Sequence, residues 1–279
     1  MSSNQFDLSF VAVGPQRTGT TWLYEMLRCH SQICMPEAVK ETMFFDKRFG
    51  RGIEWYTTYF DYGREEQING EIAPTYFDVA EVPKRIRKIA SDCEIIIGLR
   101  HPAERAFSLY LHHLRKGRVP NSFWEAVKEK PRIITAGHYS KHIPRWRSFF
   151  EERQIHFVFL SDIKSEPEEV LDQVCRYLKV KPMRPPRQTS EKVNAASMPR
   201  SLFFARAVSF LTTMLHALGF HRIVELGKKL GLRKLAYSGA EEEMPVLRGE
   251  SRKQLIDEYE EDIEYVERIT GRCLTHWRE

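Results

Sequence analysis

Cysteine is scarce in this chain of 279 residues, which contains five: Cys29, Cys34, Cys93, Cys175 and Cys273. Their spacing matches no set of metal ligands, and an odd number in a chain of this length argues against a disulfide framework. We therefore expect a reducing compartment and no metal site.

We also expect neither a signal peptide nor a membrane-spanning run in this sequence. Residues 1–8 are short and polar and lead directly into an apolar segment, which leaves no room for a signal peptide. The most apolar stretch, residues 202–220, is interrupted by Arg206 and His216 and is barely long enough to span a bilayer. An amphipathic helix that packs on the domain or lies on a membrane surface fits better. We expect a cytoplasmic protein without a transmembrane segment, for which peripheral membrane contact stays open.

Neither sign of charge is in large excess. The 43 lysines and arginines and the 38 acidic residues give a net charge of +5, spread along the sequence. This mild excess suits an anionic ligand but does not imply nucleic acid, and we expect no nucleic-acid partner. The length allows one large α/β domain or two small ones, and we expect one domain with a helical C-terminal extension.

The stretch 10–27 organises the rest of the chain. Residues 10–13 form an apolar run typical of a buried strand, and the apolar residues of 22–27 recur at helical spacing. Between them, Gly14 and Gly19 allow a tight turn whose backbone can approach a ligand. The N–H groups and positive dipole end of the following helix favour an anion. The segment therefore predicts a strand, a phosphate-binding loop and a helix.

This loop differs from that of kinases and ATPases, G-x-x-x-x-G-K-[ST], in which a lysine follows the second glycine. Here Thr20 takes the position of that lysine, and the cation is Arg17, inside the loop. Thr18 and Thr21 add further hydroxyl groups. The departure argues against ATP as the ligand.

Gly14, Arg17, Gly19, Thr20 and Thr21 match, position by position, the 5′-phosphosulfate loop of the sulfotransferases that use 3′-phosphoadenosine 5′-phosphosulfate (PAPS). The chain resembles this family, which implies a P-loop-like, three-layer α/β fold with a central parallel sheet and a helical C-terminal extension. It also implies PAPS as the cosubstrate and no metal. The expected donor-binding residues of the loop are Gly14, Arg17, Thr18, Gly19, Thr20 and Thr21.

The segment Lys40-Glu41-Thr42-Met43-Phe44-Phe45 is similar to the K-E-x-x-F-F segment of family members that act on heparan sulfate and similar acceptors. By this resemblance Glu41 is the general base and Lys40 is a cation near the donor. A hydroxyl is a poor nucleophile until a carboxylate takes its proton, which is the role expected of Glu41. A solvated surface pair is the alternative for Lys40 and Glu41.

A second buried strand over residues 93–99 ends at Arg100. Ligands of doubly wound sheets bind beyond the carboxyl ends of strands, so Arg100 lies where a phosphate would be met. Pro102 suits the first turn of the next helix, and Ser108 follows about two turns later. This arrangement resembles the family's 3′-phosphate site, R-x-P-x-x-R-x-x-S-x-Y. Arg100 and Ser108 would hold the 3′-phosphate, and Arg105 is either a third contact or structural.

The C-terminal part carries weaker signals. Residues 191–201 resemble the loop that closes over the donor, with Lys192 and Arg200 as candidate anion contacts.

Ile72 departs from the family, because heparan-type enzymes often have a lysine there that binds the acceptor or the sulfuryl group. We expect one sulfotransferase domain over residues 1–279, with a nucleotide-binding core over 6–180 and the closing loop and C-terminal helices over 181–279.

The predicted function is in-line transfer of a sulfuryl group from PAPS to a hydroxyl of a carbohydrate, lipid or natural product. Glu41 would remove the proton, and Arg17 would stabilise charge on the leaving 3′-phosphoadenosine 5′-phosphate (PAP). A P-loop kinase and a non-catalytic nucleotide-binding module are the alternatives. The position of Thr20 counts against the kinase.

Overall fold

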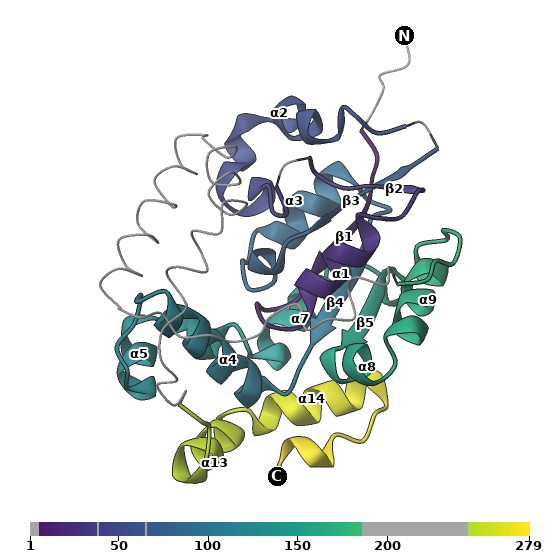
Figure 1. Ribbon diagram of the computed structural model, residues 1–279. Coiled ribbons are helices and arrows are strands. Elements are labelled where there is room, and N and C mark those ends of the chain that lie inside the picture. The colour runs from purple at the N-terminus through teal and green to yellow at the C-terminus, as the bar shows by residue number, and fades with distance from the viewer. Residues whose placement is uncertain (1–5, 38, 65, 186–244) are drawn as a thin grey trace, which may run out of the picture. The chain divides into compact units, whose positions relative to one another are not determined.

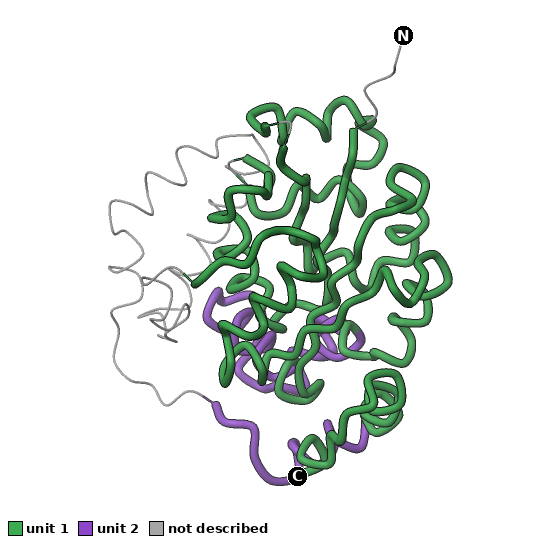
Figure 2. The backbone as a smooth tube through the Cα atoms, turned by 90° about the vertical axis from the view of Figure 1, so that its right-hand side faces the viewer, with its two compact units in different colours: residues 1–105, 136–193, 259–279 green, residues 106–135, 194–258 purple. Residues whose placement is uncertain are grey.

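The computed structural model describes residues 6–37, 39–64, 66–185 and 245–279. The chain divides into two compact units, which Figure 2 shows in different colours. The first unit comprises residues 1–105, 136–193 and 259–279, and the second comprises 106–135 and 194–258. The predicted division at residue 180 stays a prediction.

A five-stranded parallel sheet in the order β2-β3-β1-β4-β5 forms the centre of the first unit (Figure 1). Its strands are β1 (Leu8–Val13), β2 (Ile33–Cys34), β3 (Ile68–Ile72), β4 (Glu94–Leu99) and β5 (Ile155–Phe159). β1 pairs with β3, where Ala12 lies opposite Ile72, and with β4, where Val13 lies opposite Ile97. The carboxyl ends of β3, β1 and β4 are therefore neighbours. The predicted α/β fold around a central parallel sheet is confirmed.

Helices cover both faces of this sheet because the strands are apolar on both sides. In β1, Phe10 and Ala12 belong to one buried cluster, and Val11 and Val13 belong to another. The first cluster includes residues of α1 (Thr20–Leu27), α8 (Leu160–Ser165) and α9 (Pro167–Tyr177). The second includes residues of α2 (Ile53–Thr57), α3 (Val82–Ile89), α7 (Tyr139–Arg147) and α14 (Glu260–Thr270). The predicted three layers are thus present in this unit.

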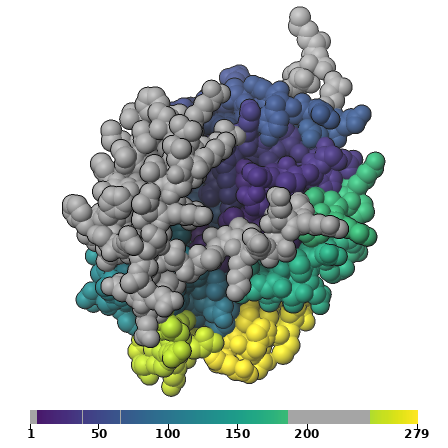
Figure 3. All heavy atoms as spheres, in the orientation of Figure 1, coloured from purple at the N-terminus to yellow at the C-terminus, as the bar shows by residue number. Residues whose placement is uncertain are grey.

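Single-turn segments connect several of these elements. They are a π-helical turn at Phe44–Arg48 and 3₁₀ turns at Phe49–Arg51, Thr58–Phe60, Pro74–Tyr76, Glu152–Gln154 and Thr275–Trp277. Figure 3 shows one outer face, where purple atoms of the N-terminal part lie beside green atoms of the segment that ends at residue 185. This contact corresponds to the packing of α1 and α9 in one cluster.

The helix α4 (Pro102–Arg115) begins in the first unit and continues into the second. The second unit also contains α5 (Phe123–Glu129), α6 (Arg132–Thr135) and α13 (Gly249–Glu258). Its described part has an aromatic cluster of Phe107, Tyr110 and Phe123, with ring centroids 5.3–5.7 Å apart. The apolar helix predicted over residues 202–220 lies outside the described residues. In the described ranges, no helix is both long enough and apolar enough to span a membrane.

Candidate active site

The loop between β1 and α1 has the conformation that its glycines predict. Gly14 and Gly19 have φ angles of 123° and 94°, and Arg17 is also left-handed, with φ 81°. A Cβ atom on Gly14 would lie 2.6 Å from the carbonyl oxygen of Gly98 in β4, so glycine is required for the loop to lie against that strand. The predicted strand, loop and helix are all present.

The hydroxyl groups of the loop have different environments. Thr18 is buried and its hydroxyl donates to the carbonyl oxygen of Pro15 at 2.9 Å, so it stabilises the loop itself. Thr20 is buried and accepts a hydrogen bond from Lys40 Nζ at 3.3 Å. Thr21 is exposed on the first turn of α1. The contribution of each to donor binding stays a prediction.

Lys40 lies close to the phosphate loop although it is 20 residues from Thr20. Burial lowers the pKa of Lys40, and the charge of Arg17 lowers it further, whereas Glu41 and Glu25 raise it. Two cations that destabilise each other are favourably placed for an anion, whose charge would relieve the repulsion.

Glu41 is half-buried, and its Oε2 accepts a hydrogen bond from Thr75 Oγ1 at 3.3 Å. Burial raises the pKa of Glu41, and Lys40 opposes the rise. Lys40 and Glu41 are both half-buried and hydrogen-bonded, which differs from a solvated surface pair. Their roles in donor binding and proton removal stay predictions.

Arg100 follows β4 and is fixed by Tyr139 of α7. The Arg100 N–H donates to the Tyr139 hydroxyl at 3.1 Å, and that hydroxyl donates to the Arg100 carbonyl oxygen at 2.7 Å. The guanidinium donates to the carbonyl oxygen of Arg17 at 3.4 Å and to Glu104 at 3.2 Å. Its Nε is buried and has no hydrogen-bond partner among the described residues. Arg100 therefore lies against the phosphate loop with a donor available for a further acceptor.

The remaining predicted site residues are spread over several segments of the chain. Arg105 is fully buried and donates to Tyr259 at 3.4 Å, which fits the structural role. Ser108 lies on α4 within the second unit, and its contact with the donor stays a prediction. Lys192 and Arg200 lie outside the described residues. Ile72 is fully buried in the apolar cluster that includes α1.

Sequence reasoning gave Gly98, Tyr139 and Glu71 no role in the site. Gly98 interrupts an isoleucine run in β4, and a glycine inside a strand often marks close backbone approach. Glu71 is a carboxylate in a buried strand, which is a comparable signal. Tyr139 carries no such signal, because its contact with Arg100 spans 39 residues.

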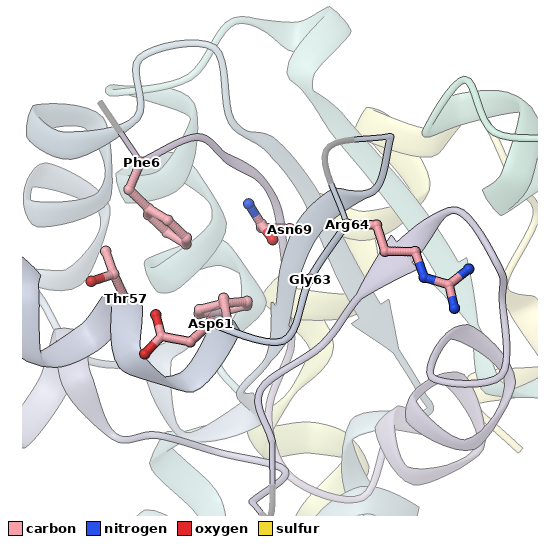
Figure 4. Close-up of a pocket in the computed structure, with 7 residues that line it drawn as sticks. Phe6, Thr57, Asp61, Gly63, Arg64 and Asn69 are labelled. Atoms are coloured by element: carbon pink, nitrogen blue, oxygen red, sulfur yellow. The ribbon is translucent and has the colours of Figure 1, made fainter. Parts of the chain in front are cut away.

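A separate surface pocket of about 230 Å³ lies beside the amino ends of β1 and β3 (Figure 4). Its lining residues are Phe6, Thr57, Phe60, Asp61, Gly63, Arg64 and Asn69. Phe6 precedes β1 and Asn69 is near the start of β3, whereas the phosphate loop follows the other end of β1. The pocket is therefore distinct from the site around Arg17.

Together, the fold and the site define a P-loop-like α/β protein with an anion site at the carboxyl edge of its sheet. In the described part of the chain, no three His, Cys, Asp or Glu residues are grouped so that they could hold a metal ion. Comparison with known families identifies a sulfotransferase domain over residues 8–199. The chain belongs to the family of PAPS-dependent sulfotransferases.

Curated relatives include a bifunctional heparan sulfate N-deacetylase/N-sulfotransferase of Drosophila melanogaster, 30% identical over 209 residues. The human heparan sulfate glucosamine 3-O-sulfotransferase 5 is 32% identical over 186 residues. Both matches cover 62% of this chain, but only 20% of the fly protein and 53% of the human one. A sulfotransferase from Alicyclobacillus acidocaldarius matches 98% of this chain and 100% of its own, with a TM-score of 0.71 at 21% identity, which shows a common fold.

Proposed function

We propose that this protein transfers a sulfuryl group from PAPS to an acceptor hydroxyl, with Glu41 as the general base. One observation carries the proposal: the half-buried Glu41 directly follows Lys40, whose ammonium group reaches Thr20 at the start of α1. A candidate base and the phosphate loop are thereby joined in one site. Family membership supports the same reaction.

The residues around the loop fit an anionic nucleotide. The N–H groups at the start of α1 and the side chain of Arg17 would hold the 5′-phosphosulfate. Arg100 would hold the 3′-phosphate, since its buried Nε has no partner among the described residues. Ser108, Lys192 and Arg200 are proposed as further contacts with the same nucleotide.

Glu41 would take the proton of the acceptor hydroxyl as the acceptor oxygen bonds to sulfur and the bond between sulfur and the phosphate oxygen breaks. Burial raises the pKa of Glu41, which makes its carboxylate a stronger base. Arg17 and Lys40 would stabilise the negative charge that develops on the leaving oxygen. Such a transfer depends mainly on positioning and charge stabilisation, which fixed cations and backbone N–H groups supply.

The acceptor is proposed as a hydroxyl of a carbohydrate, a lipid or a natural product. The relatives above are named for heparan sulfate, but the buried Ile72 replaces the lysine of heparan-type enzymes, so we do not assign that acceptor. A cytoplasmic location is part of the proposal, and the five free cysteines support it.

Isothermal titration with PAP, adenosine 5′-phosphosulfate and ATP with Mg²⁺ tests donor recognition. Preferred binding of PAP, followed by transfer of ³⁵S from labelled PAPS to members of an acceptor panel, is the expected result. Preference for ATP would favour the kinase. PAP binding without transfer to any acceptor or to water would favour a non-catalytic module.

A further inference from the structure

Glu71 of β3 is a fully buried carboxylate outside the residues assigned to the reaction. Burial of a charge is costly unless hydrogen-bond donors surround it. The donors to Glu71 are Thr42 N at 2.6 Å, Thr42 Oγ1 at 2.8 Å, the Tyr56 hydroxyl at 3.0 Å and the Tyr76 hydroxyl at 3.2 Å. Burial raises the pKa of Glu71 to about 7, and these bonds oppose the rise.

Two of these donor residues adjoin the groups that set the position of Glu41. Thr42 is the next residue in the chain, and its N–H and hydroxyl both bind Glu71 Oε1. Tyr76 directly follows Thr75, whose hydroxyl donates to Glu41. The loop that carries Glu41 and the turn that carries its hydrogen-bond donor are therefore attached to the same carboxylate.

The attachment is rigid because its members are buried and bonded to one another. Thr42 and Tyr76 are fully buried, and their hydroxyl oxygens lie 3.3 Å apart. The N–H of Phe44 donates to Thr42 Oγ1 at 3.1 Å, and the N–H of Phe45 donates to the Tyr76 hydroxyl at 3.3 Å. Glu71 itself lies on a strand paired with β1, opposite Val11. The network thus joins an irregular loop to the sheet.

From this geometry we propose that Glu71 is a positioning residue for Glu41, which it holds through Thr42 and Tyr76 in the place required for proton removal. The proposal rests on the sulfuryl transfer proposed above. Glu71 need not touch either substrate, since it acts through the two segments that it binds. A displacement of about 1 Å in a catalytic group can reduce the rate about 100-fold, so this restraint has a measurable effect.

Glu71→Gln tests the proposal because glutamine keeps the size of the side chain but has a single acceptor oxygen. The full chain is assayed at pH 8 with labelled PAPS, with water as the acceptor or with the best acceptor from the panel. The rate is expressed per PAP-binding site, counted by titration, so that loss of folded protein does not affect it. We expect kcat to fall about 100-fold and the Kd for PAP to change less than about two-fold.

Asp262→Asn is the matched control. Asp262 is a buried carboxylate that accepts bonds from Ser140 N, Ser140 Oγ and His138 Nδ1 at 2.7–2.9 Å, and none of these belongs to the segments around Glu41. Both substitutions should lower the melting temperature. Asp262→Asn can also change the Kd for PAP, because His138 and Ser140 flank Tyr139, which fixes Arg100. At saturating PAPS, only Glu71→Gln should lower kcat per PAP-binding site. Hydrogen exchange of the Thr42 amide should also accelerate in Glu71→Gln alone.

An unchanged kcat per PAP-binding site in Glu71→Gln, or an equal decrease in Asp262→Asn, would overturn the positioning role. Unchanged exchange of the Thr42 amide would do the same. A wild-type protein that binds no PAP or never cleaves PAPS would instead overturn the proposed function. Hydrogen exchange of the Thr42 amide distinguishes failure of the positioning role from failure of the proposed function, because it reports the bond between Glu71 and the loop without any substrate.

Discussion

Removal of the Arg100 guanidinium should reveal whether the end of β4 recognises a 3′-phosphate. In the structure this group contacts the Arg17 carbonyl oxygen and Glu104, and its Nε lacks a partner among the described residues. Arg100→Ala removes the charge and all of these donors, while the backbone bonds to Tyr139 can persist. The substitution therefore tests the side chain separately from the strand end.

The size of the effect follows from the bonds that are exchanged. A hydrogen bond to a charged group contributes about 1.5–3 kcal/mol, and an arginine can make two such bonds to one phosphate. The ion pair with Glu104 is partly exposed, with side-chain exposures of 19% for Arg100 and 43% for Glu104. Such a pair contributes about 0.2–1 kcal/mol, and this contribution is lost when Arg100 binds the 3′-phosphate instead of Glu104. A net loss of about 2–6 kcal/mol remains, or about 30- to 20,000-fold in Kd.

Calorimetry with PAP and with adenosine 5′-phosphate isolates this effect, because the two nucleotides differ only in the 3′-phosphate. Arg100→Ala should weaken PAP binding by the stated factor and leave adenosine 5′-phosphate within about two-fold. Arg100→Lys keeps the charge but not the planar guanidinium group, so its affinity for PAP should lie between those of the wild type and Arg100→Ala. Equal weakening of both nucleotides would refute the assignment and indicate that Arg100 acts through the Arg17 carbonyl contact.

Three further outcomes are expected. Glu41→Gln should lower kcat about 10²- to 10⁴-fold with little change in PAP affinity. Burial raises the pKa of Glu41, so the wild-type enzyme should lose activity on acidification at a higher pH than an enzyme with an ordinary glutamate base. The variant should lack this acidic decrease in rate. Equal loss of PAP binding would contradict the base assignment. Glu104→Gln frees Arg100 from its ion pair, so calorimetry should show PAP binding about two- to five-fold tighter, and weaker binding would contradict this reasoning. Gly98→Ala would place a Cβ atom 2.7 Å from Thr18 Oγ1, so the free energy of unfolding in urea should fall by about 1–3 kcal/mol, and an unchanged value would show that the loop can yield.

The parts of the fold and site that the sequence predicts are those set by short stretches of chain. The run over residues 10–13, the glycines and the helical spacing that follows are all local, and they appear as β1, the loop and α1. Arg100 was predictable because the end of a buried parallel strand has a known place in such sheets. The resemblance of the segment around Glu41 located the candidate base.

The parts that were missed depend on contacts between distant residues. Tyr139 lies 39 residues from Arg100, and Thr42 lies 29 residues from Glu71, so no pattern within one segment reveals either bond. The strand β2 has only two residues, Ile33 and Cys34, which is too short for any periodicity. Tertiary pairing, and not local preference, determines these features.

The neighbours Lys40 and Glu41 reach in different directions, the first to Thr20 on α1 and the second to Thr75 after β3. A single peptide link therefore sets the spacing between the cation at the phosphate loop and the proposed base. An insertion or deletion at this link would separate the contact with Thr20 from the contact with Thr75. In this chain, one dipeptide thus fixes the register of the loop for both proposed roles.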